Sequence, residues 1–207
     1  MRSRVQMQDR ALATRASILT SAALHVAERG VAATALTDIV SAVGVTKGAL
    51  YYHFPSKDYL VDAIVDAGTQ AIVHAEKVAT DGSHTSDPLE RMVFFTHIVA
   101  DLIERGPVLR AACSIATSDD VPFERRVVLL NTLGDTFARF AVTASDSGAI
   151  APTVDVDALA RVLTAMMFGA HRVHITSNED AALRARLDEF WSLIGCGLGG
   201  AATTTRW

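Results

Sequence analysis

The residues best able to do chemistry in this chain lie between Thr46 and Lys57, in the string TKGALYYHFPSK. Hydroxyl, ammonium, phenol and imidazole groups follow one another there, and all of them can donate hydrogen bonds to phosphate oxygens. Gly48 stands among them without a side chain that would hold its segment away from a base edge. This set supports recognition of nucleic acid; an ordinary surface helix hairpin is the alternative.

Catalytic and metal-binding patterns are weak by comparison. The chain lacks the GxSxG, Walker-type glycine-loop and HExxH patterns, and Ser114 could meet His97 only through the accident of folding. His171 and His174 are three residues apart, which leaves a metal-binding helical protein as an alternative. No carboxylate or thiol stands near them in sequence, and Arg172 lies between them. We therefore predict no enzyme, no cofactor and no metal.

Two short helices must position the TKGALYYHFPSK residues. Thr34 is expected to cap the first helix, and Gly44 allows the chain to turn at positive φ, where a Cβ would be strained. Thr46 is expected to cap the second helix, which Pro55 ends because it disfavours helical geometry in the residue before it. Ser56 then caps the next helix. This is the geometry of a helix-turn-helix, whose second helix lies in the DNA major groove.

From this arrangement we predict a set of DNA-contacting residues. Lys47, Tyr51 and Lys57 are expected on phosphates, and Thr46, Gly48 and Tyr52 near base edges. The full set is Arg15, Thr34, Thr37, Thr46, Lys47, Gly48, Tyr51, Tyr52, His53 and Lys57.

Charge is distributed unevenly along the chain. The net charge of −4 argues against a nucleic-acid partner, yet residues 1–57 carry +4 and the remainder −8. A basic head can face phosphate while an acidic body keeps the protein in solution.

The composition and periodicity indicate an all-α protein of about nine helices. Half of the residues are hydrophobic and only 6% are aromatic, which is typical of a helical globular chain. The expected helices cover about 9–29, a short pair within 34–54, 57–80, 87–106, 108–117, 123–144, 156–176 and 180–194. We place a DNA-binding domain at 8–57 and an effector-binding and dimerisation domain at 58–207.

Residues 58–207 must hold any ligand and any dimer interface. The inward apolar and polar residues proposed to line a ligand cavity are Phe94, His97, Phe137, Phe140, Thr164 and Phe168. For Thr164, a hydrogen bond to its own helix is the alternative. The stripe proposed as the dimer interface is Leu183, Leu187, Trp191 and Ile194, although the same stripe could close the core of one chain.

The string VTKGALYYHFPSK strongly resembles the DNA-binding motif of TetR-family transcriptional repressors. The resemblance extends upstream over Arg15 to Val43 and downstream to Leu60, about the first third of the chain. It implies a homodimer that joins its copies through a four-helix interface and binds pseudo-palindromic double-stranded operator DNA. It also implies that a small-molecule effector releases the operator.

A second string resembles one branch of that family. GPVLRAACSIAT and the helix start at Asp155–Asp157 are similar to the γ-butyrolactone receptors, which sense lipophilic hormones that trigger antibiotic production. Where that branch commonly carries a pocket tryptophan, this chain reads VPFERRVV, with Arg125 and Arg126. A butenolide, a furan carboxylic acid, an antibiotic, or a drug sensed by an efflux-pump regulator therefore remain alternatives to a γ-butyrolactone.

The remaining features indicate a cytoplasmic protein without a membrane partner. Cys113 and Cys196 are far apart and form no CxxC, as expected of reduced thiols. The N-terminus has no apolar signal core, and the uncharged stretch 190–205 contains too many glycines and threonines to span a membrane.

Overall fold

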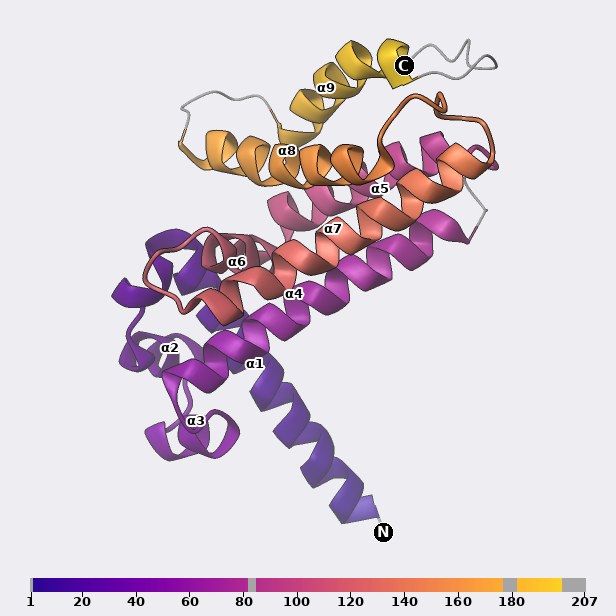
Figure 1. Ribbon diagram of the computed structural model, residues 1–207. Helices are drawn as coiled ribbons and strands as arrows, with labels where there is room; N and C mark the ends of the chain where they lie inside the picture. The colour runs from indigo at the N-terminus through magenta and orange to yellow at the C-terminus, as the bar shows by residue number, and fades with distance from the viewer. Residues whose placement is uncertain (1, 82–84, 177–181, 199–207) are drawn as a thin grey trace. The chain divides into compact units, whose positions relative to one another are not determined.

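The computed structural model describes residues 2–81, 85–176 and 182–198, with side chains from residue 6 onward except those of His174 and Cys196. Within these ranges the chain forms nine α-helices and no strand, which confirms the all-α prediction (Figure 1). The helices are α1 (Arg2–Ala33), α2 (Leu36–Val43), α3 (Lys47–His53), α4 (Lys57–Thr80), α5 (Pro88–Arg105), α6 (Pro107–Ala116), α7 (Phe123–Asp146), α8 (Val156–Thr176) and α9 (Leu183–Leu198). The predictions for the side chains of His174 and Cys196, and for the residues beyond Leu198, lie outside the described residues.

The first and last helices differ most from the sequence-based ranges. Helix α1 begins at Arg2 rather than near Asp9, and Gly30, with φ of 79° and ψ of 170°, interrupts it where a stop was expected. Helix α9 begins at Leu183 rather than near residue 180 and continues through Gly195 and Gly197 to Leu198. Glycine disfavours a helix by only about 1 kcal/mol per residue, which the packing of a helix face can offset.

Side-chain caps define several of the other helix starts. The Asp87 carboxylate accepts from the backbone N–H of Leu89 at 2.8 Å and begins α5, with Pro88 in the first turn. Asp155 accepts from the N–H groups of Asp157 and Ala158 at 3.0 Å and begins α8. Each cap satisfies N–H groups that have no partner inside the helix.

The chain divides into two compact units. The first unit comprises residues 1–68 and 107–128, and the second comprises residues 69–106 and 129–207. The boundary between these compact units falls inside α4, after Gly68. The functional division into residues 8–57 and 58–207 is a separate matter and stays a prediction. Helix α6 belongs to the first unit because α1 packs against it.

The core of the first unit lies between α1, α2, α3 and α6. Small and branched side chains of α1 face the neighbouring helices, and each is almost completely buried. The buried set on α1 comprises Ile18, Ala22, Ala23 and Val26. A face of this kind allows close helix packing.

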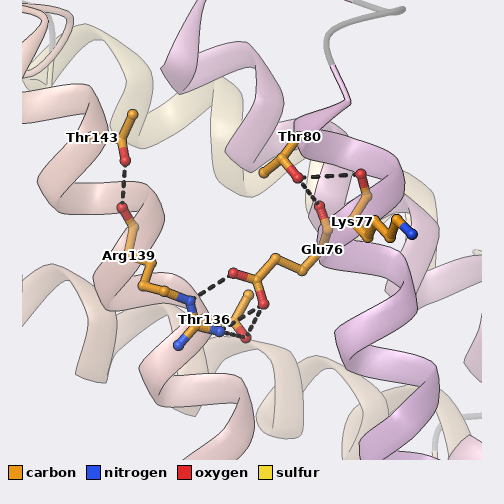
Figure 2. Close-up of polar contacts among 6 residues, drawn as sticks. All are labelled: Glu76, Lys77, Thr80, Thr136, Arg139 and Thr143. Atoms are coloured by element: carbon orange, nitrogen blue, oxygen red, sulfur yellow. Dashed lines mark hydrogen bonds and ion pairs between the residues drawn. The ribbon is translucent and has the colours of Figure 1, made fainter.

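The second unit is held by apolar packing and by polar contacts between its helices. Helix α9 packs on α5 and on α8. Figure 2 shows the polar cluster, in which Arg139 of α7 donates to both carboxylate oxygens of Glu76 of α4 at 2.6 Å. The buried hydroxyl of Thr136 bonds the same carboxylate at 3.2 Å. Its hydrogen bond with Glu76 raises the pKa of Arg139.

Candidate nucleic-acid interface and effector pocket

The turn between α2 and α3 has the geometry that its residues predict. Gly44 ends α2 in the left-handed region at φ of 73° and donates its N–H to the Val40 carbonyl at 3.0 Å. Thr46 caps α3 by accepting from the Ala49 N–H at 3.1 Å. The predicted roles of Gly44 and Thr46 are confirmed, because both satisfy backbone groups at helix ends.

Two buried side chains anchor α3 and decide which of its faces is outward. Leu50 and Phe54 are almost completely buried. Tyr51 and Tyr52 lie on the opposite side with 49% and 80% of their surface exposed, although tyrosine side chains usually bury most of their area. Tyr52 also stacks edge-to-face on His53, with ring centroids 5.1 Å apart. The outward face of α3 therefore carries aromatic rings with polar tips.

The N-terminal turn of α3 is equally open. Thr46, Lys47 and Gly48 are all exposed. A Cβ added to Gly48 would meet only the Thr46 hydroxyl oxygen, at 3.8 Å, which is an ordinary contact. Nothing inside the fold therefore requires glycine at this position. Thr37 of α2 is exposed as well.

The structure overturns the predicted role of Thr34 and gives Arg15 and Lys57 contacts within the chain. Thr34 does not cap α2: Ala35 takes the N-cap position without a side-chain bond, and the buried Thr34 hydroxyl donates to the Gly30 carbonyl at 2.8 Å. We therefore remove Thr34 from the interface. The Arg15 guanidinium lies 4.9 Å from the centroid of the Phe54 ring, and Lys57 donates from Nζ to the Ala32 carbonyl at 3.2 Å. Both cations thus help to hold α1 against the region of α3.

Ser56 behaves as expected at the start of α4. Its hydroxyl accepts from the Tyr59 N–H at 3.3 Å, and only Phe54, Pro55 and Ser56 separate α3 from α4. So short a connection ties the position of α3 to the first turn of α4.

Only some of the predicted ligand-contacting residues come together in the second unit. Phe137 and Phe140 both stack against Phe95, with centroid distances of 5.5 and 5.2 Å, and all three rings are buried. Phe168 is buried and Phe94 is half-buried. Phe95 stands outside the set of six proposed ligand-contacting residues, because no sequence signal separates it from an ordinary core residue, yet it contacts two of them.

His97 and Thr164 line two different hollows. His97 lies beside a cavity of about 450 Å³ between α5 and α9. Its Nε2 is 3.0 Å from the Asp188 carboxylate, while burial and the nearby Arg184 lower its pKa. Thr164 lines an open groove of about 480 Å³ between α7 and α8, and its hydroxyl donates to the Ala160 carbonyl at 2.8 Å. The alternative for Thr164, a bond to its own helix, is the arrangement observed.

Three of the four residues predicted at a dimer interface lie in the core of a single chain instead. Leu183, Leu187 and Trp191 are each at most 1% exposed. The indole N–H of Trp191 donates to the buried Thr96 hydroxyl at 3.0 Å, which ties α9 to α5. The prediction was wrong for these three residues because α5 covers the stripe. Ile194 remains half-buried.

The Cys113 and His171 side chains, which could otherwise react, lie buried in the fold. Burial raises the pKa of the Cys113 thiol to about 12, so it is protonated near neutral pH. His171 is buried on α8. Across the part of the chain that the structure describes, no group of three metal-ligating side chains comes together. No helix in the same ranges is long and apolar enough to cross a membrane.

Comparison with protein families matches both parts of the chain. Residues 18–64 match the family described as bacterial regulatory proteins, tetR family, and residues 86–199 match the tetracyclin repressor-like C-terminal domain. The A-factor receptor protein of Streptomyces griseus is 28% identical over 187 residues, which is 90% of this chain. The chain spans 64% of the length of that relative.

Solved structures extend the similarity to the whole fold. A crystal structure of a γ-butyrolactone receptor, an ArpA-like protein, superposes with a TM-score of 0.80 at 30% identity over 93% of this chain and 91% of the other. CprB from Streptomyces coelicolor, in complex with its operator sequence, superposes with a TM-score of 0.77 at 31% identity, again over 93% and 91%.

Proposed function

Because the chain belongs to the TetR family of bacterial regulatory proteins, we propose that it is a transcriptional repressor whose operator binding is reversed by a small molecule. Its DNA-reading domain is residues 8–57, and residues 58–207 bind the effector and the second copy. A protein that reads operator DNA acts in the cytoplasm.

The observation that carries this proposal is the outward face of α3. Thr46, Lys47 and Gly48 open the helix, Tyr51 and Tyr52 continue the same exposed surface, and buried Leu50 holds it in place. Hydroxyl and ammonium groups position a protein on phosphates, whereas close approach at Gly48 allows contact with base edges. Exposed Thr37, with Arg15, His53 and Lys57, completes the proposed interface.

The decisive experiment is selection of an operator from random duplex DNA, followed by titration with Gly48 variants. Gly48→Leu should weaken operator binding by about a hundredfold or more, which corresponds to about 3 kcal/mol. Its melting temperature should stay close to wild type because Gly48 is exposed and an added Cβ makes only an ordinary contact with the Thr46 hydroxyl. Gly48→Ala, which adds one methyl group, is the graded control. Loss of the fold in Gly48→Leu would mark the glycine as structural, and a wild type that enriches no sequence would refute the repressor proposal.

We propose a lipophilic signalling molecule as the effector, of γ-butyrolactone, butenolide or furan-carboxylic-acid type. Similarity to the A-factor receptor protein supports the class, and the buried rings of Phe137, Phe140 and Phe168 supply an apolar environment. The effector shifts the protein between two states by binding the DNA-free state more tightly. Release of a labelled operator by an alkyl γ-butyrolactone, compared with a furan carboxylic acid bearing the same chain, tests the class. An operator complex that resists both compounds would argue against it.

We also propose a homodimer that joins its copies through the outward apolar residues of α8 and α9. Leu193 is 82% exposed, and Val162 and Val173 are about half exposed on α8, which packs beside α9. A dimer suits an operator with two half-sites about 34–36 Å apart. Leu193→Asp should yield monomers by sedimentation while keeping its helical circular dichroism. Leu187→Asp, which buries a charge inside one chain, should unfold instead. A monomeric wild type at micromolar concentration would contradict the dimer.

A further inference from the structure

Arg125 forms the most extensive ion-pair contact in the described part of the first unit. Its Nε donates to Oδ1 of Asp62 at 2.6 Å, and its Nη2 is 3.4 Å from Oδ2 of the same carboxylate. A third contact joins Nη1 to Asp58 at 3.4 Å. Asp58 and Asp62 are four residues apart on α4 and therefore share one face of its first two turns. One side chain of α7 thus holds the start of α4 at two points.

The position of Arg125 at the start of its own helix gives the ion pair with Asp58 and Asp62 an electrostatic reason. Arg125 and Arg126 stand in the first turn of α7, where the positive end of the helix dipole disfavours cations. Asp58, by contrast, stands in the first turn of α4, where the dipole favours an anion. The bridge therefore offsets an unfavourable charge on α7, and the hydrogen bond that Arg125 donates to Asp62 raises the pKa of Arg125.

The bridge lies directly beside the helix that faces DNA. The connection from α3 to α4 is only Phe54–Ser56, and the residue that opens α4 is Lys57, whose Nζ bonds the Ala32 carbonyl at the end of α1. Phe54 is buried, so the connection cannot swing freely. The first turns of α4 therefore set the position of α3, and Arg125 holds those turns.

We infer that Arg125 is a positioning residue for operator recognition: its bridge to Asp58 and Asp62 fixes the direction in which α4 leaves α3. The inference rests on the proposed repressor function. Arg125 acts through α4 and makes no phosphate contact itself. Its loss lowers the preference for operator over other DNA, because base-edge contacts depend on helix position more strongly than the long-range attraction to phosphates does.

The test compares Arg125→Gln with Arg126→Gln, a matched control with the same loss of charge one residue away. Arg126 pairs with Asp119, which precedes α7 in the loop, at 3.3 Å. With an operator selected by the wild type, Arg125→Gln should lower the ratio of operator to non-specific affinity about three- to fivefold, the scale of a partly exposed ion pair. Arg126→Gln should leave that ratio unchanged. The slope of log affinity for non-specific DNA against log salt should be the same in both variants, because neither arginine neutralises a phosphate.

A double-mutant cycle separates positioning from general stability. Asp62→Asn should lower the ratio as Arg125→Gln does, and the double variant should lose no more than either single variant, because the two residues act as one contact. Glu76→Gln breaks the bridge that Arg139 makes to α4 in the second unit, across the same 63-residue separation, and should leave the ratio unchanged. Additive losses, or an Arg125→Gln ratio equal to wild type, would overturn the inference while leaving the repressor proposal intact. A wild type that selects no operator would overturn both.

Discussion

Helices α3 and α9 carry their aromatic side chains in opposite ways. Tyr52 of α3 is 80% exposed, whereas Trp191 of α9 is 1% exposed and donates a hydrogen bond from its indole N–H to the Thr96 hydroxyl. Both helices have an apolar stripe, but α3 has only seven residues and is anchored mainly by Leu50 and by Phe54 just beyond its end. Helix α9 has sixteen residues and lies against α5. An aromatic side chain on an apolar helix thus remains exposed, and available for binding, only where the helix is short or few neighbouring helices pack against it.

The largest test of this comparison asks whether the buried rings of the second unit are core or cavity wall. Phe137→Ala should lower the free energy of unfolding by about 3–5 kcal/mol, because the completely buried ring leaves a cavity between α5 and α7. Chemical denaturation measures the loss. Phe123→Ala, on the same helix with 65% of its residue surface exposed, is the control and should change stability by less than about 1 kcal/mol. A small loss for Phe137→Ala combined with a lost effector response would show an open ligand pocket at this ring.

A smaller loss of stability is expected when the hydrogen bond between α9 and α5 is removed. Thr96→Val keeps the shape of the side chain but leaves the buried Trp191 N–H without an acceptor, which should cost about 1–3 kcal/mol of stability. Thr143→Val removes an exposed hydroxyl that bonds only its own helix at 2.8 Å, and should be nearly neutral. Equal melting temperatures for the two variants would contradict a structural role for the Trp191 bond.

The smallest expected effect is on DNA affinity and concerns Lys47 on the exposed face of α3. Lys47→Ala should weaken binding to all DNA sequences and reduce the slope of log affinity against log salt by about one unit, because one phosphate is no longer neutralised. Lys77→Ala on α4 removes an equivalent exposed charge from the second unit and should leave the slope unchanged. An unaltered slope in Lys47→Ala would show that this ammonium does not reach a phosphate.

Local chemistry made the region of α2 and α3 predictable. Gly44 turns at positive φ, Thr46 and Ser56 cap their helices, and Leu50 lies inward, each for a reason confined to its own few neighbours. Thr34 was the exception. A threonine hydroxyl can cap the next helix or bond the carbonyl four residues back, and here the carbonyl of Gly30 is in place to accept it.

The second unit was less predictable because its residues depend on distant partners. Spacing places Leu187 and Trp191 on one stripe whether that stripe meets α5 or a second copy of the chain. His97 and Thr164 likewise seemed suited to one pocket, yet they line different hollows.

The sequence by itself determined the helical class, the capped turn and the polar outward face of α3, since these follow from propensities and caps within a few residues. Only the tertiary structure decided which apolar stripe is core, that Phe95 joins Phe137 and Phe140, and that Arg125 reaches Asp58 and Asp62. Those outcomes depend on contacts between residues about 40 to 95 positions apart. The periodicity of one helix carries no information about which other helix will cover it.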